Sequence, residues 1–475
     1  MTTLTNRNIN FSILDRGKID QIHAASIHLM EKIGQRVDGQ RALTFFLDHG
    51  AAVSPDGLVK IPGSLVGKAL KTVPKELILY NRAGEPAMSV GQNNNIYFGC
   101  HADMLEIVDP FTGQVRDFVK RDIALMCKIG DYLPNIHFVL SVGLARDVPP
   151  EIQTLTSFFE TLKNFSKPIN FSTNDIQSLQ QVIDLAAIVA GGHDQLQQKP
   201  FVFNYCEPIP PLNHPEESTE KLTISAKNRI PVVYMPYCMM GGTSPQSFAG
   251  SLVQCNAEVL TGLVLTQLVN EGAPFIYGAM PSIMDMKSTI GSYGAAELHL
   301  LVAAASEMAD YYGLPFYGTA GCTDARQLDE QAVVEATMEI FSSILSKANL
   351  IHDVGVADHC NNVCPELVVL SDEIIETIKH YTQGIAVDSE ELALGVIEKV
   401  GPGGAYLTEN HTMKNFKKIY YSDLFGRQMQ SPDQSEVRGD IRIKIKHIIK
   451  NHHVPQLDKA VLKELDRYYA KLTTP

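Results

Sequence analysis

The sequence lacks the long apolar runs that membrane proteins need. No apolar stretch reaches the ~18 residues of a membrane span, and the best candidate, 258–269, is short and contains Thr and Gln. The first residues are polar and carry no apolar core of a secretory signal. Since the 475 residues include only 8 cysteines, we expect a cytoplasmic protein with reduced thiols and no membrane partner.

The sequence also has little positive charge. Its 53 acidic residues outnumber 40 Lys and Arg residues, which gives a formal net charge of −13. The basic residues are scattered rather than gathered in a stripe, so no nucleic-acid partner is expected. The acidic balance fits a soluble enzyme that meets cationic or small neutral ligands.

Several common catalytic motifs are absent. There is no Walker loop, and the glycines at 401–404 lack the spacing and the strand–turn–helix context of a dinucleotide-binding fingerprint. The G-x-S-x-G elbow of α/β-hydrolases is missing as well. No repeat of 20–50 residues and no low-complexity tract is evident. These absences argue against the familiar nucleotide-binding and serine-hydrolase classes.

What the sequence does contain is an alternation of short apolar segments with helical ones. Eight segments are typical of buried parallel strands, and the helices between the later ones imply right-handed crossovers. We expect an α/β fold of the (β/α)8 TIM-barrel type, with a doubly wound open sheet as the alternative. The expected strands are 95–100, 135–142, 168–172, 201–205, 231–235, 274–278, 315–318 and 349–354. The expected helices are 175–190, 215–227, 247–269, 295–312 and 329–346.

The rest of the chain flanks this barrel. Residues 1–94 are expected to form a helical and β cap, with helices over 18–33 and 39–49. The barrel itself is assigned to 95–421. Residues 422–475 are charged and helical in pattern, and we expect them to dock on the outside as a C-terminal extension.

Aromatic residues gather at the C-terminal ends of the expected strands, where barrels of this type place their active sites. Core packing explains any single one of them. The tyrosine hydroxyls, however, need polar partners, and aromatic faces bind quaternary ammonium groups by cation–π contact. The aromatic candidates are Tyr97, Phe98, Phe203, Tyr205, Tyr234, Tyr237, Phe275, Tyr277, Phe316 and Tyr317, and the polar residues at the same ends include His101, Asp103, Glu207, Asp324, His352 and His359.

A zinc site is the competing interpretation of one cluster. His352, His359, Cys360 and Cys364 fall within 13 residues, and Cys322 lies on the preceding loop. Zinc binds such ligands, but this spacing matches no standard zinc motif. The cluster also fits ordinary buried Cys and His residues, so we expect no bound metal.

Four motifs make the chain recognisable. They are Glu207-Pro-Ile-Pro-Pro-Leu, Gly278-Ala-Met-Pro-Ser-Ile-Met-Asp-Met-Lys, Thr323-Asp-Ala-Arg-Gln-Leu-Asp-Glu-Gln-Ala and Ala348-Asn-Leu-Ile-His-Asp-Val-Gly. With them the sequence resembles the trimethylamine methyltransferase superfamily from the first helix to about residue 428. The resemblance implies a (β/α)8 barrel that demethylates methylamines and methylates the cobalt of a partner corrinoid protein.

Two departures from that family narrow the expected substrate. Its trimethylamine-specific members carry pyrrolysine near the loop that matches 318–324, whereas this chain has Gly-Thr-Ala-Gly-Cys-Thr-Asp there. The resemblance therefore points to members that use glycine betaine, proline betaine, carnitine or γ-butyrobetaine. Some relatives have a basic residue after the proline that matches Pro315, but Phe316 follows it here, which puts an arginine clamp for a substrate carboxylate in doubt.

The chemistry of a quaternary amine supports this reading. Its nitrogen departs as a neutral tertiary amine, so no acid–base residue is assigned. The barrel has to desolvate the cation and aim one methyl group at the acceptor. The acceptor is cob(I)alamin on the corrinoid protein, and no permanently bound cofactor is expected. We expect substrate contacts from the aromatic and polar candidates Tyr97, Phe98, Tyr205, Glu207, Tyr234, Tyr277, Phe316, Tyr317, His352 and His359.

Two further expectations concern the loop after the seventh strand and the substrate carboxylate. A loop formed by Gly318, Gly321, Cys322 and Asp324 should face the corrinoid and leave room for the methyl group. His352, and after it His359, should hold any substrate carboxylate. A zinc-dependent methyltransferase acting on a thiol or alcohol and a non-catalytic betaine-binding barrel stay open as alternatives, as does a homo-oligomer.

Overall fold

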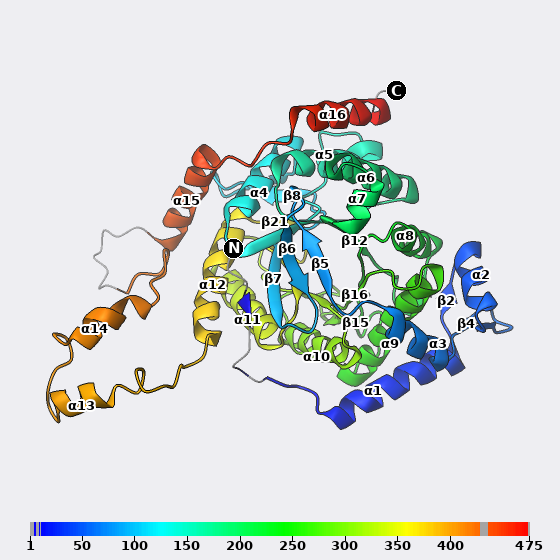
Figure 1. The fold of residues 1–475 in the computed structure, drawn as a ribbon. Helices are drawn as coiled ribbons and strands as arrows, with labels where there is room; N and C mark the ends of the chain where they lie inside the picture. Colours follow the sequence, from blue (N-terminus) through cyan, green and yellow to red (C-terminus); the bar gives the residue numbers. More distant parts are fainter. Residues whose placement is uncertain (1–3, 6–8, 10, 428–435, 474–475) are drawn as a thin grey trace.

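Eight parallel strands form a closed barrel at the centre of the molecule (Figure 1). The computed structural model describes residues 4–5, 9, 11–427 and 436–473. Strand β7 hydrogen-bonds to β10 on one side and to β19 on the other, which closes the sheet. The predicted barrel is thereby confirmed, and the open sheet is excluded. The barrel strands are β7 (Asn95–Cys100), β10 (Ile136–Leu140), β11 (Ile169–Phe171), β12 (Val202–Cys206), β14 (Val232–Tyr234), β16 (Phe275–Gly278), β18 (Phe316–Thr319) and β19 (Leu350–Val354).

A layer of helices surrounds these strands, and all five predicted helices are present. Aspartates cap two of them: the Asp175 carboxylate accepts a hydrogen bond from the backbone N–H of Ser178, and that of Asp329 accepts one from Ala332. Gly191 and Gly313 end two helices in the left-handed conformation. The layer contains α4 (Lys120–Tyr132), a 3₁₀ turn (Pro150–Ile152), α5 (Gln153–Asn164), α6 (Ile176–Ala190), α7 (His193–Gln198), α8 (Glu216–Lys227), α9 (Phe248–Val269), α10 (Ala296–Tyr312), α11 (Glu330–Leu345) and α12 (Pro365–Thr382).

Helix α9 is the most apolar helix of this layer. Among the described residues it alone has the length and hydropathy of a membrane span, and 83% of its most apolar window is buried inside the fold. It packs between the barrel and the N-terminal helices. Its hydropathy is therefore accounted for by contacts on both sides.

The helices of the N-terminal segment pack against α9 and α8 outside the barrel, and its β-hairpin covers the base, where the strands begin. Helix α1 (Arg16–His28) continues as a π-helical turn (Leu29–Ile33), and α2 (Gln40–Asp48) and α3 (Gly63–Thr72) follow. The hairpin of β5 (Leu77–Tyr80) and β6 (Pro86–Val90) lies across the base, where the Tyr97 hydroxyl accepts a hydrogen bond from Ser89 N–H. The short strands of this segment are β1 (Leu4–Thr5), β2 (Arg36–Val37), β3 (Ala52–Val53) and β4 (Val59–Lys60).

At the opposite end, the mouth, loops that follow the strands build two small sheets. The sequence did not predict them. The first joins loops after β7 and β19, which are the first and last barrel strands in the chain, and the second extends β14 and β16 beyond the barrel. Their members are β8 (Glu106–Val108), β9 (Val115–Asp117), β20 (Val356–Ala357) and β21 (Asn362–Val363) in the first, and β15 (Met239–Met240) and β17 (Ser282–Ile283) in the second. Strand β13 (Asn213–His214) pairs with β2.

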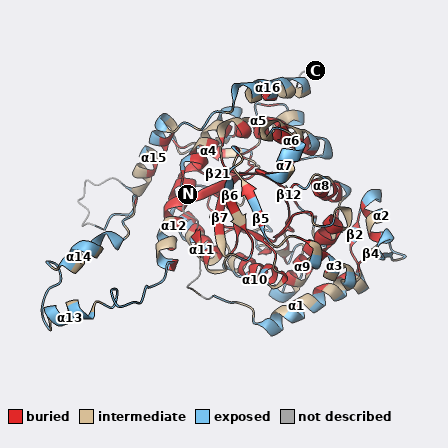
Figure 2. Cartoon of the chain, in the orientation of Figure 1, coloured by how far each residue is buried: buried red, intermediate tan, exposed pale blue. Residues whose placement is uncertain are grey.

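The chain after α12 leaves the barrel. We assigned residues up to 421 to the barrel, but α13 (Leu394–Val400), α14 (Asn410–Asn415) and a 3₁₀ turn (Phe416–Lys418) stand away from it (Figure 1). Figure 2 shows this segment as exposed or intermediate, in contrast to the buried strands. Helices α15 (Val437–Asn451) and α16 (Lys459–Thr473) return to the body as the predicted extension.

Candidate active site

The upper lumen of the barrel holds a cluster of three aromatic rings. The ring of Tyr317 on β18 lies 4.7 Å from that of His352 on β19, and the Tyr205 ring on β12 lies 5.9 Å from His352 and 6.1 Å from Tyr317. Strand β12 is not a neighbour of β18 or β19 in the sheet, so these ring contacts cross the lumen and all three side chains face it. The structure thus brings together three of the predicted site residues.

A second aromatic layer closes the lumen beneath this cluster. The Phe203 ring lies 5.5 Å from Phe138 and 6.4 Å from Tyr317, and all three side chains are fully buried. The Tyr317 hydroxyl donates to Asn170 Oδ1 at 2.7 Å, and the Asn170 side-chain amide donates to the Phe203 carbonyl at 2.8 Å. The lumen is therefore a packed core, as is usual for this fold. We use the word recess for the solvent-accessible or partly accessible groups above it at the mouth, namely Tyr205, Glu207 and Asp103.

Two carboxyl groups line that recess. Tyr205 donates its hydroxyl to Glu207 Oε2 at 3.1 Å, and Asp103 accepts a short hydrogen bond from Ser172. Glu207 is exposed and Asp103 is half-buried, yet the surrounding protein raises the pKa of Glu207 and raises that of Asp103 to about 6. Glu207 and Asp103 are thus reached by solvent although protein atoms surround them closely, as is typical of residues in an open cavity.

A third carboxyl group, that of Asp353, is paired with His352 deeper in the recess. His352 donates Nδ1–H to the Gly318 carbonyl at 2.8 Å, and its Nε2 lies 3.0 Å from Asp353 Oδ2. Thr319 donates its hydroxyl to the same oxygen at 2.8 Å, and burial raises the pKa of Asp353. Both nitrogens of His352 are thus engaged by the protein, which leaves neither for a substrate carboxylate.

Lys221 on α8 is the ammonium group beside the two outer carboxyl groups. Its positive charge opposes the burial-driven rise in the pKa of both Asp103 and Glu207. The ammonium donates a short hydrogen bond to the Thr173 carbonyl and lies 2.5 Å from Glu217 Oε1. The recess therefore combines carboxylates, aromatic faces and one ammonium group.

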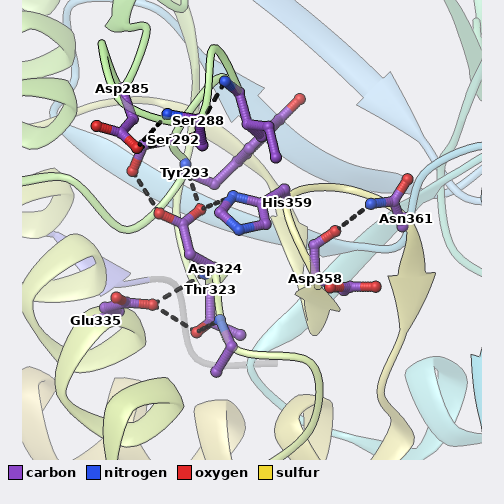
Figure 3. Close-up of polar contacts among 12 residues, drawn as sticks. Asp285, Ser288, Ser292, Tyr293, Thr323, Asp324, Glu335, Asp358, His359 and Asn361 are labelled. Carbon is purple, nitrogen blue, oxygen red and sulfur yellow. Dashed lines mark hydrogen bonds and ion pairs between the residues drawn. The ribbon is translucent and has the colours of Figure 1, made fainter.

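Three loops meet at the rim around Asp324 (Figure 3). Asp324 Oδ1 accepts from the backbone N–H of Tyr293 at 2.7 Å and lies 3.0 Å from Nδ1 of His359, at an angle too bent for a hydrogen bond. Its other carboxylate oxygen accepts a short hydrogen bond from Ser292. Asp358, His359 and Cys360 all have positive φ angles of 53–68°. Non-glycine residues seldom adopt this conformation, and such strain is concentrated at functional sites.

Four of the predicted aromatic residues lie on the outer face of the strands or at the base. The Tyr234 hydroxyl is 2.7 Å from His214 Nδ1, and Tyr277 donates to Asn256 Oδ1 on α9 at 3.0 Å. Phe316 lies on the face of β18 opposite Tyr317, and Tyr97 contacts the hairpin at the base. These hydroxyls have the polar partners that we expected of tyrosines, but the partners are groups of the protein.

The outer face also contains Phe98 and Gly318. Phe98 alternates with Tyr97 and shares its face with Cys100, whose sulfur lies beside Gly130 of α4. The space next to Gly318 is filled by the Phe316 ring and Val302 of α10. Gly318 therefore allows helix packing, and it does not open the room that we predicted for the methyl group.

The other two residues of the predicted corrinoid-facing loop are packed as well. Gly321 has a φ of 80°, and a side chain there would meet Val354 at 3.2 Å. Cys322 is fully buried, and its backbone N–H donates to Glu339 Oε2 at 2.7 Å. Of the loop residues that we proposed, Asp324 is the one whose carboxylate reaches the rim.

The candidate zinc ligands do not converge. Across the part of the chain that the structure describes, no three His, Cys, Asp or Glu side chains are grouped to hold a metal ion. His352 pairs with Asp353 and His359 with Asp324, and burial raises the pKa of Cys360 to about 12 and that of Cys364 to about 11. Thiols with raised pKa values are poor sources of thiolate ligands.

Sequence reasoning missed Asn170, Lys221 and Asp353 as site residues. Asn170 is a polar residue inside a predicted buried strand, and Asp353 directly follows His352. Both positions could have indicated site residues, because polar side chains are rare in buried strands. Lys221 gives no such signal, because a lysine on an amphipathic helix is ordinary. Its place beside the recess follows only from the three-dimensional fold.

The comparisons with known proteins agree with this architecture. Residues 1–474 match the family described as trimethylamine methyltransferase (MTTB). The glycine betaine methyltransferase of Desulfitobacterium hafniense is 29% identical over 470 residues, which are 97% of each chain. The trimethylamine methyltransferase MttB of the same species is 32% identical over 411 residues, with 86% of this chain and 82% of the relative covered.

More distant likenesses extend to other organisms. The trimethylamine methyltransferase MttB of Methanosarcina barkeri is 29% identical over 472 residues, which cover 96% of this chain and 94% of the relative. Among solved structures, the monomethylamine methyltransferase MtmB of that organism is 12% identical, with a TM-score of 0.45 and coverage of 93% and 96%. Because the family match spans almost the whole chain, the protein belongs to the trimethylamine methyltransferase family.

Proposed function

We propose that this methyltransferase removes a methyl group from a quaternary amine and transfers it to cob(I)alamin on a corrinoid protein. The observation that carries the proposal is the recess at the mouth of the barrel. There the Tyr205 ring and two solvent-accessible carboxyl groups, those of Asp103 and Glu207, lie around one opening. Aromatic faces and carboxylates together bind a cation that cannot donate a hydrogen bond.

The reaction needs positioning more than acid–base chemistry. The methyl carbon forms a bond to the cobalt of the acceptor, the C–N bond breaks, and its electron pair stays on nitrogen. A neutral tertiary amine leaves, so no proton has to be supplied. The Tyr205 ring and the carboxylates hold the ammonium group in place, and the packed aromatic layer below excludes water from its inner side.

The acceptor protein has an apolar rim on which to dock. Six large apolar residues are exposed at the mouth, five on loops that follow barrel strands and one at the first residue of α9. Apolar residues on a polar rim are typical of protein-binding surfaces. They are Leu105, Phe111, Ile209, Phe248, Met286 and Ile290.

A substrate carboxylate would be held by Lys221 rather than by His352. Both ring nitrogens of His352 are engaged, whereas the Lys221 ammonium, which contacts the Thr173 carbonyl and Glu217, has a third N–H to donate and lies beside Asp103 and Glu207. This revises our expectation for His352, whose ring then contributes as part of the aromatic cluster. Lys221→Met should weaken glycine betaine more than choline, which has no carboxylate, by about 10-fold, the lower range for a charge-assisted hydrogen bond.

The test is tertiary amine formation in the presence of cob(I)alamin and a corrinoid protein. We expect turnover of at least one of glycine betaine, proline betaine, carnitine and choline, and none of trimethylamine. Trimethylamine-specific members of the family carry pyrrolysine near the loop that matches 318–324, whereas this chain has Gly-Thr-Ala-Gly-Cys-Thr-Asp there. Turnover of trimethylamine alone would refute the substrate class, and tight binding of a betaine without methyl transfer would favour a binding protein.

The zinc-dependent alternative has less support. The candidate ligands are engaged in separate pairs, and no described group of side chains has the geometry of a metal site. Activity towards a thiol or an alcohol that disappears on chelation and returns with zinc would favour that alternative.

A further inference from the structure

A long segment projects from the body of the protein and buries none of its own residues. The arm, residues 384–419, leaves the end of α12 and carries α13 and α14 (Figures 1 and 2). Every residue of the arm is exposed or partly exposed. Ten of these are large and apolar: Ile385, Val387, Leu392, Leu394, Ile397, Tyr406, Leu407, Met413, Phe416 and Ile419. Ile385 is 92% exposed and Leu407 is 80% exposed.

The arm has an internal structure of its own. Lys399 pairs with Glu409 at 2.6 Å, and Lys418 forms a short ion pair with Glu391, so the outgoing and returning limbs are tied together. At its return to the body, Tyr420 donates its hydroxyl to Glu373 of α12 at 2.5 Å. Exposed apolar side chains in this number are typical of a surface that binds another protein surface.

The same chain presents a matching apolar surface on the helices next to the arm. Leu300 of α10, Val334 and Met338 of α11 and Tyr381 of α12 are all exposed, and we call these four residues the receiving face. Helices α11 and α12 adjoin there, since the Phe341 and Tyr381 rings lie 5.5 Å apart. The Ser342 hydroxyl donates to the His299 carbonyl, which joins α11 to α10.

We propose that the arm of one molecule packs on the receiving face of a second copy of the same chain. Each molecule carries both apolar surfaces. In a symmetric pair, the arm of each copy therefore covers the receiving face of the other. If half of the ten arm side chains are buried at roughly 100 Å² each, the arms of the two copies together bury ~1,000 Å². The receiving faces bury an equal area, so the contact buries ~2,000 Å² in total. That area is in the range of stable homodimers.

The position of the arm argues against the corrinoid protein as its partner. Helix α12 follows β19 and runs back from the mouth towards the base, so the arm begins at the end of α12 that is remote from the mouth. A protein that docks over the recess does not cover the arm of the same subunit. The acidic and basic residues of the arm are close to balance, which also favours an apolar self-contact over electrostatic recognition.

Light scattering and sedimentation equilibrium of the full chain test this inference. We expect the wild-type protein to be a dimer or a larger closed assembly. Two double variants should both shift the protein to monomer. The arm variant combines Leu394→Asp with Leu407→Asp, and the face variant combines Val334→Asp with Met338→Asp. Val53→Asp, which changes an exposed apolar residue on β3 of the cap, should leave the mass unchanged. Far-UV circular dichroism of every variant should match the wild type, because the changed side chains are exposed.

Mixing the two variants gives an internal control. The arm variant keeps an intact receiving face and the face variant keeps an intact arm, so a mixture should re-form assemblies through one restored contact. A monomeric wild type, or arm variants with unchanged mass, would overturn the proposal. A monomer whose arm variants lose binding to the corrinoid protein would overturn it as well and would assign the arm to that partner.

Discussion

Tyr205 and Tyr234 lie on neighbouring strands at nearly the same height, yet they face opposite sides of the barrel wall. Tyr205 pairs across the strands with Val233, and Tyr234 pairs with Cys206. This offset of one residue turns one ring into the lumen and the other towards the helices. Tyr317 and Tyr277 show the same contrast.

The polar groups on the two sides differ in what they contact. Outside the wall, Tyr234 contacts His214, whose other nitrogen is 2.6 Å from Gln35 Oε1, and the Gln35 amide donates to Thr261. Every member of that chain has a protein partner. At the mouth of the lumen, solvent reaches Glu207 and Asp103. The outer network stabilises the fold, whereas the inner groups are available to a ligand.

The largest effect on substrate affinity should come from neutralising both outer carboxyl groups. Glu207→Gln combined with Asp103→Asn should lower kcat/KM for a quaternary amine about 100-fold, which corresponds to about 2.7 kcal/mol. Because burial raises both pKa values, the change should not lower the melting temperature. Glu464→Gln, on the exposed face of α16, is the matched control. An unchanged kcat/KM in the double variant would contradict the proposed cation site.

Removing one lumen ring should have a smaller effect. Tyr205→Leu should weaken binding about 10-fold, because a desolvated cation–π contact contributes ~1–2 kcal/mol. Tyr205→Phe keeps the ring and should retain most of the affinity. Equal losses for Tyr205→Phe and Tyr205→Leu in a calorimetric titration would show that the hydroxyl matters and that the ring does not.

Binding should also weaken as the pH falls through about 6. Burial raises the pKa of Asp103 to about 6, so acid removes a negative charge that attracts the cation. Affinity should fall several-fold from pH 7 to pH 5, and Asp103→Asn should flatten that part of the profile. The stability contribution has the opposite sign. A carboxyl group whose folded pKa is raised holds its proton more tightly than in the unfolded chain, so its contribution rises as the pH falls through 6.

The outer tyrosines should leave substrate affinity unchanged. Tyr234→Phe leaves His214 Nδ1 without its buried partner, and Tyr277→Phe does the same to Asn256 Oδ1. Each change should lower the free energy of unfolding by about 1–3 kcal/mol. Chemical denaturation measures this loss, and a calorimetric titration checks affinity. A marked loss of affinity without a loss of stability would place these tyrosines in the site after all.

Removal of metal ions by a chelator should have no effect on activity, which is the smallest effect expected here. The positive charge of a quaternary amine already makes its nitrogen a leaving group, so the reaction needs no Lewis acid. Treatment with a chelator should leave the rate with a quaternary amine unchanged, and elemental analysis should find no stoichiometric zinc. A loss of activity that zinc restores would contradict this expectation.

The sequence was sufficient to predict the barrel but not the direction of its side chains. All eight strands and five of the helices followed from short apolar runs and the helical stretches between them, because buried parallel strands have few other compositions. Tyr205 and Tyr234 look alike in the sequence, since each lies near the C-terminal end of a predicted strand. Their sides are set by how each strand enters the closed sheet, which is a property of eight strands together.

The partners of the polar residues were equally inaccessible to sequence reasoning. His352 was a good candidate for a substrate carboxylate until the structure placed Gly318 and Asp353 on its two nitrogens. Both contacts depend on register and on the positive φ of Asp353. The arm was missed for a related reason, because residues 384–419 contain apolar side chains as a core segment does.

The packed layer of Phe138, Phe203 and Tyr317, with the hairpin across the base below it, closes the lumen from beneath, so the recess is reached from the mouth. In the proposed reaction the amine enters, and its demethylated product leaves, through the opening that the acceptor protein covers. Binding and release therefore follow a fixed order: the amine binds before the acceptor docks, and the acceptor departs before the product does. Excess acceptor should then slow turnover by trapping the empty enzyme and the product complex, which is the kinetic signature of a compulsory order.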